Sequence, residues 1–324
     1  MGSDAGGLGL IGLDELRAAQ VAIAGKVHRT PTFTSATLGA MTGTDLYLKA
    51  ELFQKTGSFK PRGALNKMLS LSEEERARGV ITISAGNHAQ GVAFAARELG
   101  IRATVVMPLT AVRSKVDATR GYGAEVILHG DMKDLLPKAR EIEAERGLTF
   151  VHPFDDPYII AGQGTVGLEL MEDVPEPWAV IVPVGGGGLI SGVATTVKLL
   201  SPTTRVIGVE PEGAPGMTLS LRDGVPAHLD STNTIADGLA APFAGDRNFE
   251  HVKAYVDDVV LLTDEEIAAG LRLLMERAKL QAEPSGAAAF ASLLAGKVRV
   301  PAGARVVCIV SGGNVDRSRL KELL

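Results

Sequence analysis

The chain has 324 residues, of which 45% are hydrophobic and 22% charged, as is typical of a globular protein. Its net charge is −5 and no cluster of Lys or Arg stands out, which argues against a role in binding nucleic acid or a membrane surface. The single cysteine, Cys308, excludes an intrachain disulfide and a cysteine-rich zinc site. Because Cys308 lies in the apolar run 305–310, we expect a small buried side chain rather than a reactive nucleophile.

The N-terminal segment lacks the basic stretch of a signal peptide. No run of about 18 apolar residues, the length of a membrane-spanning helix, occurs anywhere in the chain. We therefore expect a cytoplasmic protein that acts on a small molecule, with no membrane or nucleic-acid partner.

Short runs rich in Val and Ile alternate with longer segments of helical periodicity. The predicted strands, in chain order, are 45–52, 80–84, 103–108, 124–128, 179–184, 205–210 and 305–310. The predicted helices between them include 89–100, 112–123 and 264–280. Continuous apolar strands separated by helices indicate an α/β fold, with parallel sheets covered on both faces.

The spacing of these elements predicts two domains. Residues 80–153 hold three closely spaced strand–helix pairs and form a small domain. Residues 1–79 and 154–324 together form a large, discontinuous domain, with a cleft between the two. Ligands of open α/β sheets bind beyond the carboxyl ends of the strands, where the polar turns 84–91, 185–192 and 311–316 are predicted to lie.

The four consecutive glycines Gly185 to Gly188 stand between a predicted strand and a predicted helix. Bare N–H groups at a helix N-terminus bind anions, so a phosphate is the expected ligand. A nucleoside-triphosphate loop needs Lys and Ser/Thr next, but Leu189 and Ile190 follow. A dinucleotide site stays open, since Glu210 ends the next predicted strand, and a flexible turn is the remaining alternative.

Lys60 precedes Pro61, and proline is favourable in the first turn of a helix. At a helix start the dipole and limited solvation both lower the pKa of a lysine, whose amine then forms a Schiff base with a carbonyl. An ordinary solvent-exposed lysine explains the same segment, so both interpretations stay open at this point. An amine nucleophile and a phosphate cradle together point to pyridoxal phosphate, which carries an aldehyde and a phosphate.

Five motifs occur in the order and spacing found in the serine/threonine dehydratases: TGSFKPRGA, SAGNHAQG, GGGGL, IADG and SGGN. The chain resembles this family from about residue 15 to about residue 320. The resemblance implies the tryptophan synthase β-like fold (fold type II), with two open α/β domains and pyridoxal phosphate in the cleft between them. It also implies a lyase that converts L-threonine or L-serine to 2-oxobutanoate or pyruvate and ammonia, as a homodimer or homotetramer.

The resemblance also implies a role for each motif residue. The implied cofactor-binding residues are Phe59, Lys60, Asn87, Gly185, Gly186, Gly187, Gly188, Leu189, Gly238 and Ser311. Among these, Lys60 is the catalytic residue, bonded to the cofactor aldehyde, while Asn87 contacts the ring hydroxyl and Ser311 faces the pyridine nitrogen. Ser84, Asn87 and His88 are implied to hold the substrate carboxylate. For His88 a helix-capping or core histidine is the alternative.

A metal site is less well supported. Relatives that bind a divalent ion carry the motif EPxxAxD, which here reads EPEGAPG. Glu210 and Ala214 match its glutamate and its carbonyl donor, but Gly216 replaces the aspartate. With one carboxylate missing, we expect weak binding of a divalent ion, a monovalent ion or no ion. Glu210 is alternatively only a carboxylate at a strand end.

The choice of reaction depends on Ala85. In related serine racemases a second serine follows the one that matches Ser84, and Ala85 stands there with no proton to give. We therefore expect dehydration rather than racemisation. The apolar Phe154 favours threonine or serine over 3-hydroxyaspartate or phenylserine. A non-catalytic protein that binds a phosphate-bearing metabolite is the distant alternative and requires an idle Lys60.

Overall fold

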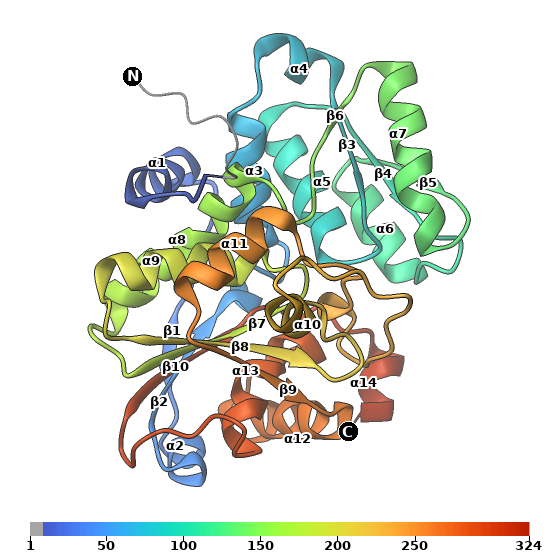
Figure 1. Cartoon of the computed structure of the whole chain (residues 1–324). Coiled ribbons are helices and arrows are strands. Elements are labelled where there is room, and N and C mark those ends of the chain that lie inside the picture. Colours follow the sequence, from blue (N-terminus) through green and yellow to red (C-terminus); the bar gives the residue numbers. More distant parts are fainter. Residues whose placement is uncertain (1–8, 324) are drawn as a thin grey trace.

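The computed structural model describes residues 9–323 and contains two sheets (Figure 1). The larger sheet has the order β1-β2-β10-β7-β8-β9 and the smaller one the order β5-β4-β3-β6. All neighbouring strands are parallel except β1 and β2. The strands are β1 Thr32–Thr34, β2 Asp45–Ala50, β3 Val80–Ile83, β4 Ala103–Met107, β5 Glu125–Leu128, β6 Thr149–Phe150, β7 Ala179–Pro183, β8 Arg205–Pro211, β9 Asp258–Leu262 and β10 Arg305–Val310.

Helices cover both faces of the larger sheet. Helices α12 and α13 lie on one side of it, and α8 and α9 lie on the other (Figure 1). The helices are α1 Leu13–Ile23, α2 Ala36–Thr42, α3 Lys60–Leu69, α4 Glu73–Arg78, α5 Asn87–Leu99, α6 Arg113–Gly121, α7 Leu135–Arg146, α8 Pro157–Asp173, α9 Gly188–Leu200, α10 Gly216–Asp223, α11 Asp246–Tyr255, α12 Asp264–Leu273, α13 Pro284–Leu294 and α14 Arg317–Leu323.

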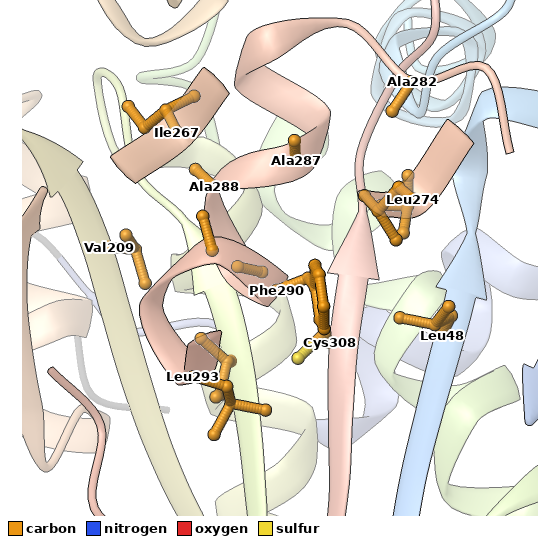
Figure 2. Close-up of a cluster of buried hydrophobic side chains, with 14 of the residues drawn as sticks. Leu48, Val209, Ile267, Leu274, Ala282, Ala287, Ala288, Phe290, Leu293 and Cys308 are labelled. Carbon is orange, nitrogen blue, oxygen red and sulfur yellow. The ribbon is translucent and has the colours of Figure 1, made fainter. Parts of the chain in front are cut away.

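The alternation of side chains along the central strands builds two hydrophobic layers. On β10, Cys308 points toward α12 and α13, while the adjacent Val307 and Ile309 point toward the α9 side. Figure 2 shows Cys308 in the same cluster as Phe290 of α13. Burial raises the pKa of the Cys308 thiol, so the expectation of an inert, buried cysteine is confirmed.

The smaller sheet follows the same rule. Val80 and Val105 pack with α5, while Ile81 and Val106 pack against α7 on the opposite face. Its four strands all come from the segment between residues 80 and 150, and the strands of the larger sheet all lie outside that segment. We accordingly propose residues 80–153 as the small domain and 1–79 with 154–324 as the large one.

The predicted α/β class with mainly parallel sheets is confirmed, but several elements differ from the prediction. The strands β1, β6 and β9 were not predicted, because they lie at sheet edges and are only partly buried. The predicted helix 264–280 is α12 followed by a π-helical turn over Leu274–Ala278. This wider turn ends at Lys279, in a left-handed conformation, and brings both Leu274 and Leu280 into the core. Within residues 9–323, none of the helices has both the length and the apolar character needed to cross a bilayer.

Candidate functional site

Lys60 is the first residue of α3, and Pro61 follows in the first turn as predicted. The preceding Phe59 donates its N–H to the carbonyl of Ser311 at 3.2 Å, which ties the start of α3 to the end of β10. The ammonium of Lys60 donates to the carbonyl oxygen of Pro153 at 2.9 Å. Burial lowers the pKa of Lys60 to about 8, as the helix-start position led us to expect, although here desolvation is the dominant cause.

Glycines bring two neighbouring helices close to the start of α3. A Cβ atom on Gly91 of α5 would lie 3.0 Å from Cβ of Lys60. A Cβ atom on Gly162 of α8 would lie 2.6 Å from the carbonyl oxygen of Arg62. Helix α3 therefore fits between α5 and α8 only because side chains are absent at these crossings. The position of Lys60 is set by tertiary packing as well as by its own motif.

The glycine run forms the turn between β7 and α9. Gly187 has φ +98° and caps the helix, and the turn is buried apart from the partly buried Gly185. The carbonyl of Gly186 accepts from the N–H of Gly245 at 3.2 Å and from Nδ2 of Asn248 at 2.9 Å. Within residues 9–323, none of the N–H groups of Gly185 to Leu189 donates to a protein acceptor. Five neighbouring donors are thus available to an anion.

The glycine run also packs closely against other protein atoms. A Cβ atom on Gly186 would lie 2.5 Å from the ring of Phe154, and one on Gly187 would lie 2.7 Å from Cβ of Asn248. Protein atoms therefore occupy the positions that these side chains would take. Close packing against Phe154 and Asn248 fixes the loop in this conformation.

The start of α5 provides a second set of free donors. Ser84 accepts the N–H of Gly86 through Oγ at 3.0 Å, and α5 begins at Asn87 without a side-chain cap. In the described part of the chain, the N–H groups of Asn87 and His88 have no protein acceptor. A carboxylate fits such a helix start.

The imidazole of His88 points away from this helix start. It is 4% exposed, and its Nε2 lies 3.0 Å from Oγ1 of Thr82 and 3.4 Å from the carbonyl of Val151. Burial and the nearby charge of Lys60 lower the pKa of His88 well below its usual value. The imidazole of His88 is therefore engaged in the core, and a role of His88 in holding a substrate carboxylate stays a prediction. Only its backbone N–H remains at the helix start.

Three other predicted residues, Asn87, Gly238 and Ser311, gather where the end of β10 and the start of α13 meet the start of α5. The N–H of Gly238 donates to Oγ of Ser285 at 2.9 Å, and Oγ of Ser311 lies 3.5 Å from the carbonyl of Ser285. Nδ2 of Asn87 donates to Oε1 of Glu283 at 2.6 Å. Sequence reasoning missed Ser285 and Glu283, although the segment AEPSG (282–286) that contains them spans the start of α13.

Asn314 was also missed, although it ends the motif SGGN. Its Nδ2 donates to the carbonyl of Thr56 at 2.7 Å and to Oδ1 of Asn87 at 2.8 Å. The amide of Asn87 is therefore held from both sides by residues distant in sequence.

The carboxylate proposed as a metal ligand has protein partners in this structure. Both carboxylate oxygens of Glu210 accept hydrogen bonds from the start of α10: the N–H of Met217 at 2.7 Å, and the N–H and hydroxyl of Thr218 at 2.8 and 2.7 Å. Ala214 adds no carboxylate, and residues 9–323 contain no cluster of three His, Cys, Asp or Glu side chains suited to an ion. Glu210 serves here as a cap for α10.

Comparisons with known sequences and solved structures identify proteins similar to this chain. An L-threonine ammonia-lyase from Thermotoga maritima is 49% identical over 316 residues, which cover 97% of this chain and 78% of that protein. The catabolic L-threonine dehydratase TdcB of Escherichia coli K12 is 44% identical over 315 residues, which cover 97% of this chain and 96% of that protein. The solved structure of maize serine racemase has a TM-score of 0.93 and 41% identity, and covers 97% of both chains.

The family profile described as "Pyridoxal-phosphate dependent enzyme" matches residues 23–312. This range includes Lys60, the glycine turn before α9 and the start of α5. Together with the two mainly parallel sheets, it shows that the chain belongs to the family of pyridoxal-phosphate-dependent enzymes and has fold type II.

Proposed function

We propose that this protein is a pyridoxal-phosphate-dependent dehydratase that converts L-threonine, L-serine or both to the 2-oxo acid and ammonia. The observation that carries the proposal is the combination of a desolvated amine at Lys60 with two helix starts whose N–H groups lack protein acceptors. One helix start suits a phosphate and the other suits a carboxylate. The similarity to the L-threonine ammonia-lyase of Thermotoga maritima supports the choice of substrate.

The residues present fit the cofactor. In the proposal the N–H groups of Gly185 to Leu189 hold the phosphate, and Phe59 and Gly238 flank the ring. Asn87 contacts the ring hydroxyl, and the hydroxyl of Ser311 faces the pyridine nitrogen. When bound, pyridoxal phosphate supplies an aldehyde for the amines of Lys60 and of the substrate, and a ring that accepts the electron pair left at the α-carbon.

The proposed chemistry needs one group that moves a proton and one that orients the substrate. With a pKa of about 8, about a tenth of the Lys60 amines are neutral at pH 7, against about one in three thousand for an ordinary lysine. A neutral amine at this position can take the α-proton of the substrate. The N–H groups at the start of α5 would hold the substrate carboxylate. The β-hydroxyl would leave as water with a proton equivalent to the one taken from the α-carbon, and one water would then hydrolyse the released enamine to the 2-oxo acid and ammonia.

Serine racemisation is the second candidate, since the structure of maize serine racemase is closely similar. Ala85 argues against it, because its methyl group offers no proton beside Ser84. Phe154 packs against His152 and Phe243, with ring centroids 4.8 and 5.2 Å apart, and this aromatic group favours a small substrate over a second carboxylate.

A homodimer or homotetramer is proposed as well, and sedimentation measures it directly.

An absorbance spectrum and a substrate panel test the proposal. Purified protein should show a visible band of lysine-bound cofactor near ~410 nm and should release 2-oxo acid from threonine or serine. Lys60→Ala should still bind the cofactor but lose the band and nearly all turnover. Normal turnover in this variant would show that Lys60 is not the nucleophile. A band with no 2-oxo acid from any β-hydroxy amino acid would leave a cofactor-binding protein and contradict the dehydratase.

A further inference from the structure

Glu283 is a buried carboxyl group that the proposed chemistry leaves unused. It is 8% exposed and immediately precedes α13. Its N–H donates to the carbonyl of Gly312 at 3.0 Å, and its own carbonyl accepts the N–H of Ala287 at 3.0 Å. Because both the N–H and the carbonyl of Glu283 are hydrogen-bonded, its backbone is fixed and its side chain points toward the start of α5.

The carboxyl group lies against residues that the proposed function places around the cofactor. Its Oε1 accepts from Nδ2 of Asn87 at 2.6 Å. A Cβ atom on Gly312 would overlap the same oxygen, and one on Gly238 would lie 4.0 Å from it. A larger residue at position 312 would displace the carboxyl group. This explains why Gly312, the first glycine of the motif SGGN, has no side chain.

The amide of Asn87 has its orientation dictated by its two partners. Both N–H groups of the Asn314 side chain are committed, one to the carbonyl of Thr56 and one to Oδ1 of Asn87. Oδ1 of Asn87 must therefore face Asn314, and Nδ2 must face Glu283. One N–H of Asn87 is used by the carboxyl group, and the second remains for another acceptor.

Glu283 accepts from Asn87 through Oε1 whether or not its carboxyl group is ionised, because the protonated form keeps a carbonyl oxygen as an acceptor. Burial raises its pKa to about 7, while the hydrogen bond from Asn87 and the positive charge of Lys115 act in the opposite direction. Lys115 comes from α6 and forms an ion pair with Asp237 at 3.3 Å, so both of these charges face Glu283 from outside its own helix.

We propose that Glu283 is a positioning residue, which fixes the amide of Asn87 so that its second N–H is presented to the ring hydroxyl of pyridoxal phosphate. The inference rests on the proposed function for the assignment of Asn87 to that hydroxyl. Glu283 acts through Asn87 and does not itself touch the substrate. Its carboxylate makes Asn87 a donor toward the cofactor without any cost for reorienting the amide on binding.

Cofactor binding and the visible band test this inference without relying on turnover. Glu283→Ala should weaken the affinity for pyridoxal phosphate about ten-fold, the equivalent of one well-formed hydrogen bond, and should shift the visible band. Glu283→Gln keeps an oxygen acceptor for Asn87 and should stay within about three-fold of the unchanged protein. Glu266→Ala is the control, since it also removes a carboxyl group that accepts a backbone N–H at a helix start, that of Thr263 before α12. It should leave the affinity and the band unchanged.

A double-mutant cycle separates positioning from general damage. In an Asn87→Ala background, the substitution of Glu283 by Ala should have no further effect on cofactor affinity, because the two residues act as one unit. Glu283→Ser replaces Glu283→Ala in the cycle if the latter does not fold. Unchanged affinity and band in the single variant would overturn the inference, and so would an equal loss in the Asn87→Ala background.

The two proposals fail in different ways. Protein that shows the band but does not convert threonine or serine would contradict the dehydratase and leave the Glu283 test in force. Protein without any cofactor band would contradict both.

Discussion

The amine of Lys60 belongs to the first residue of a helix, lies next to a carbonyl oxygen and is shielded from solvent. The carbonyl of Pro153 holds the ammonium at 2.9 Å, whereas burial favours the neutral form and brings the pKa to about 8. The partly buried side chain is therefore ready to react at a pH where an ordinary lysine is almost fully charged.

The covalent capture of pyridoxal phosphate by cofactor-free protein should follow this pKa. Only the neutral amine attacks an aldehyde, so the rate of capture should rise with pH and level off above about pH 8. Stopped-flow absorbance across pH 6 to ~10 measures it, with free lysine as the reference. A rate that kept rising toward the ordinary lysine pKa would mean that the amine is solvated.

We expect Ala85 to set the balance between elimination and racemisation. A proton for the second face of the substrate would come from this position, and a general acid is typically worth about 10²–10⁴-fold in rate. D-serine formation should therefore be at least ~100-fold slower than elimination in the unchanged protein. In Ala85→Ser, D-serine should rise while 2-oxo acid release persists, as followed by chiral chromatography. Comparable racemisation and elimination before the substitution would point to another proton donor on the second face.

At the scale of elements, the site is built from the starts of α3, α5 and α9. Glycine at Gly91 and Gly162 allows α5 and α8 to approach α3, and the glycine turn sets the start of α9. Within residues 9–323, the starts of α5 and α9 leave N–H groups without a protein acceptor, and the start of α3 carries the amine of Lys60.

Gly187→Ala should reduce the affinity for pyridoxal phosphate by at least ten-fold. A side chain at φ +98° is strained, and its Cβ would lie 2.7 Å from Cβ of Asn248, so the turn and its N–H groups must move. Gly224→Ala is the control, because Gly224 also has a positive φ of +75° but has open space around it. Both variants should lose about 1 kcal/mol or more of stability, and only Gly187→Ala should lose cofactor affinity by fluorescence titration. Equal affinities in the two variants would place the phosphate elsewhere.

At the scale of the whole molecule, a buried ionic network joins α3 to the larger sheet. Arg62 contacts Glu51 at 2.8 Å and Glu169 at 2.7 Å, and Lys49 of β2 contacts Glu169 at 2.8 Å. Burial alone would raise the pKa of Glu169, but Arg62 and Lys49 hold it below its usual value. Arg62 lies two residues after Lys60 along α3. The same helix therefore carries both a member of the ionic network and the amine of the candidate site.

Arg62→Ala should lower the free energy of unfolding by about 3–5 kcal/mol, because it leaves the buried carboxylate of Glu51 without a cation and that of Glu169 with Lys49 alone. Arg29→Ala is the matched control. Arg29 pairs with Glu172 and Asp173 at a half-exposed position, where such pairs contribute at most about 1 kcal/mol. Urea unfolding of both variants gives the comparison. Similar losses of stability in the two variants would show that the buried ion pairs contribute no more than the half-exposed ones.

The features that depend on local chemistry could be predicted from the amino-acid sequence. Apolar runs with helices between them indicated the parallel sheets, and the motif around Lys60 indicated an amine at a helix start. Four glycines after a strand indicated an anion-binding turn. These features could be predicted because each is encoded within about ten consecutive residues, through periodicity, turn chemistry or helix capping.

The contacts between polar groups distant in sequence became visible in the fold alone. The imidazole of His88 is buried in the core, and the carboxylate of Glu210 caps α10. The fold also brings Glu283 to Asn87, which lies 196 positions away in the chain. No periodic pattern records such a contact, because the direction of a polar side chain is chosen by the buried donors and acceptors that the fold places beside it.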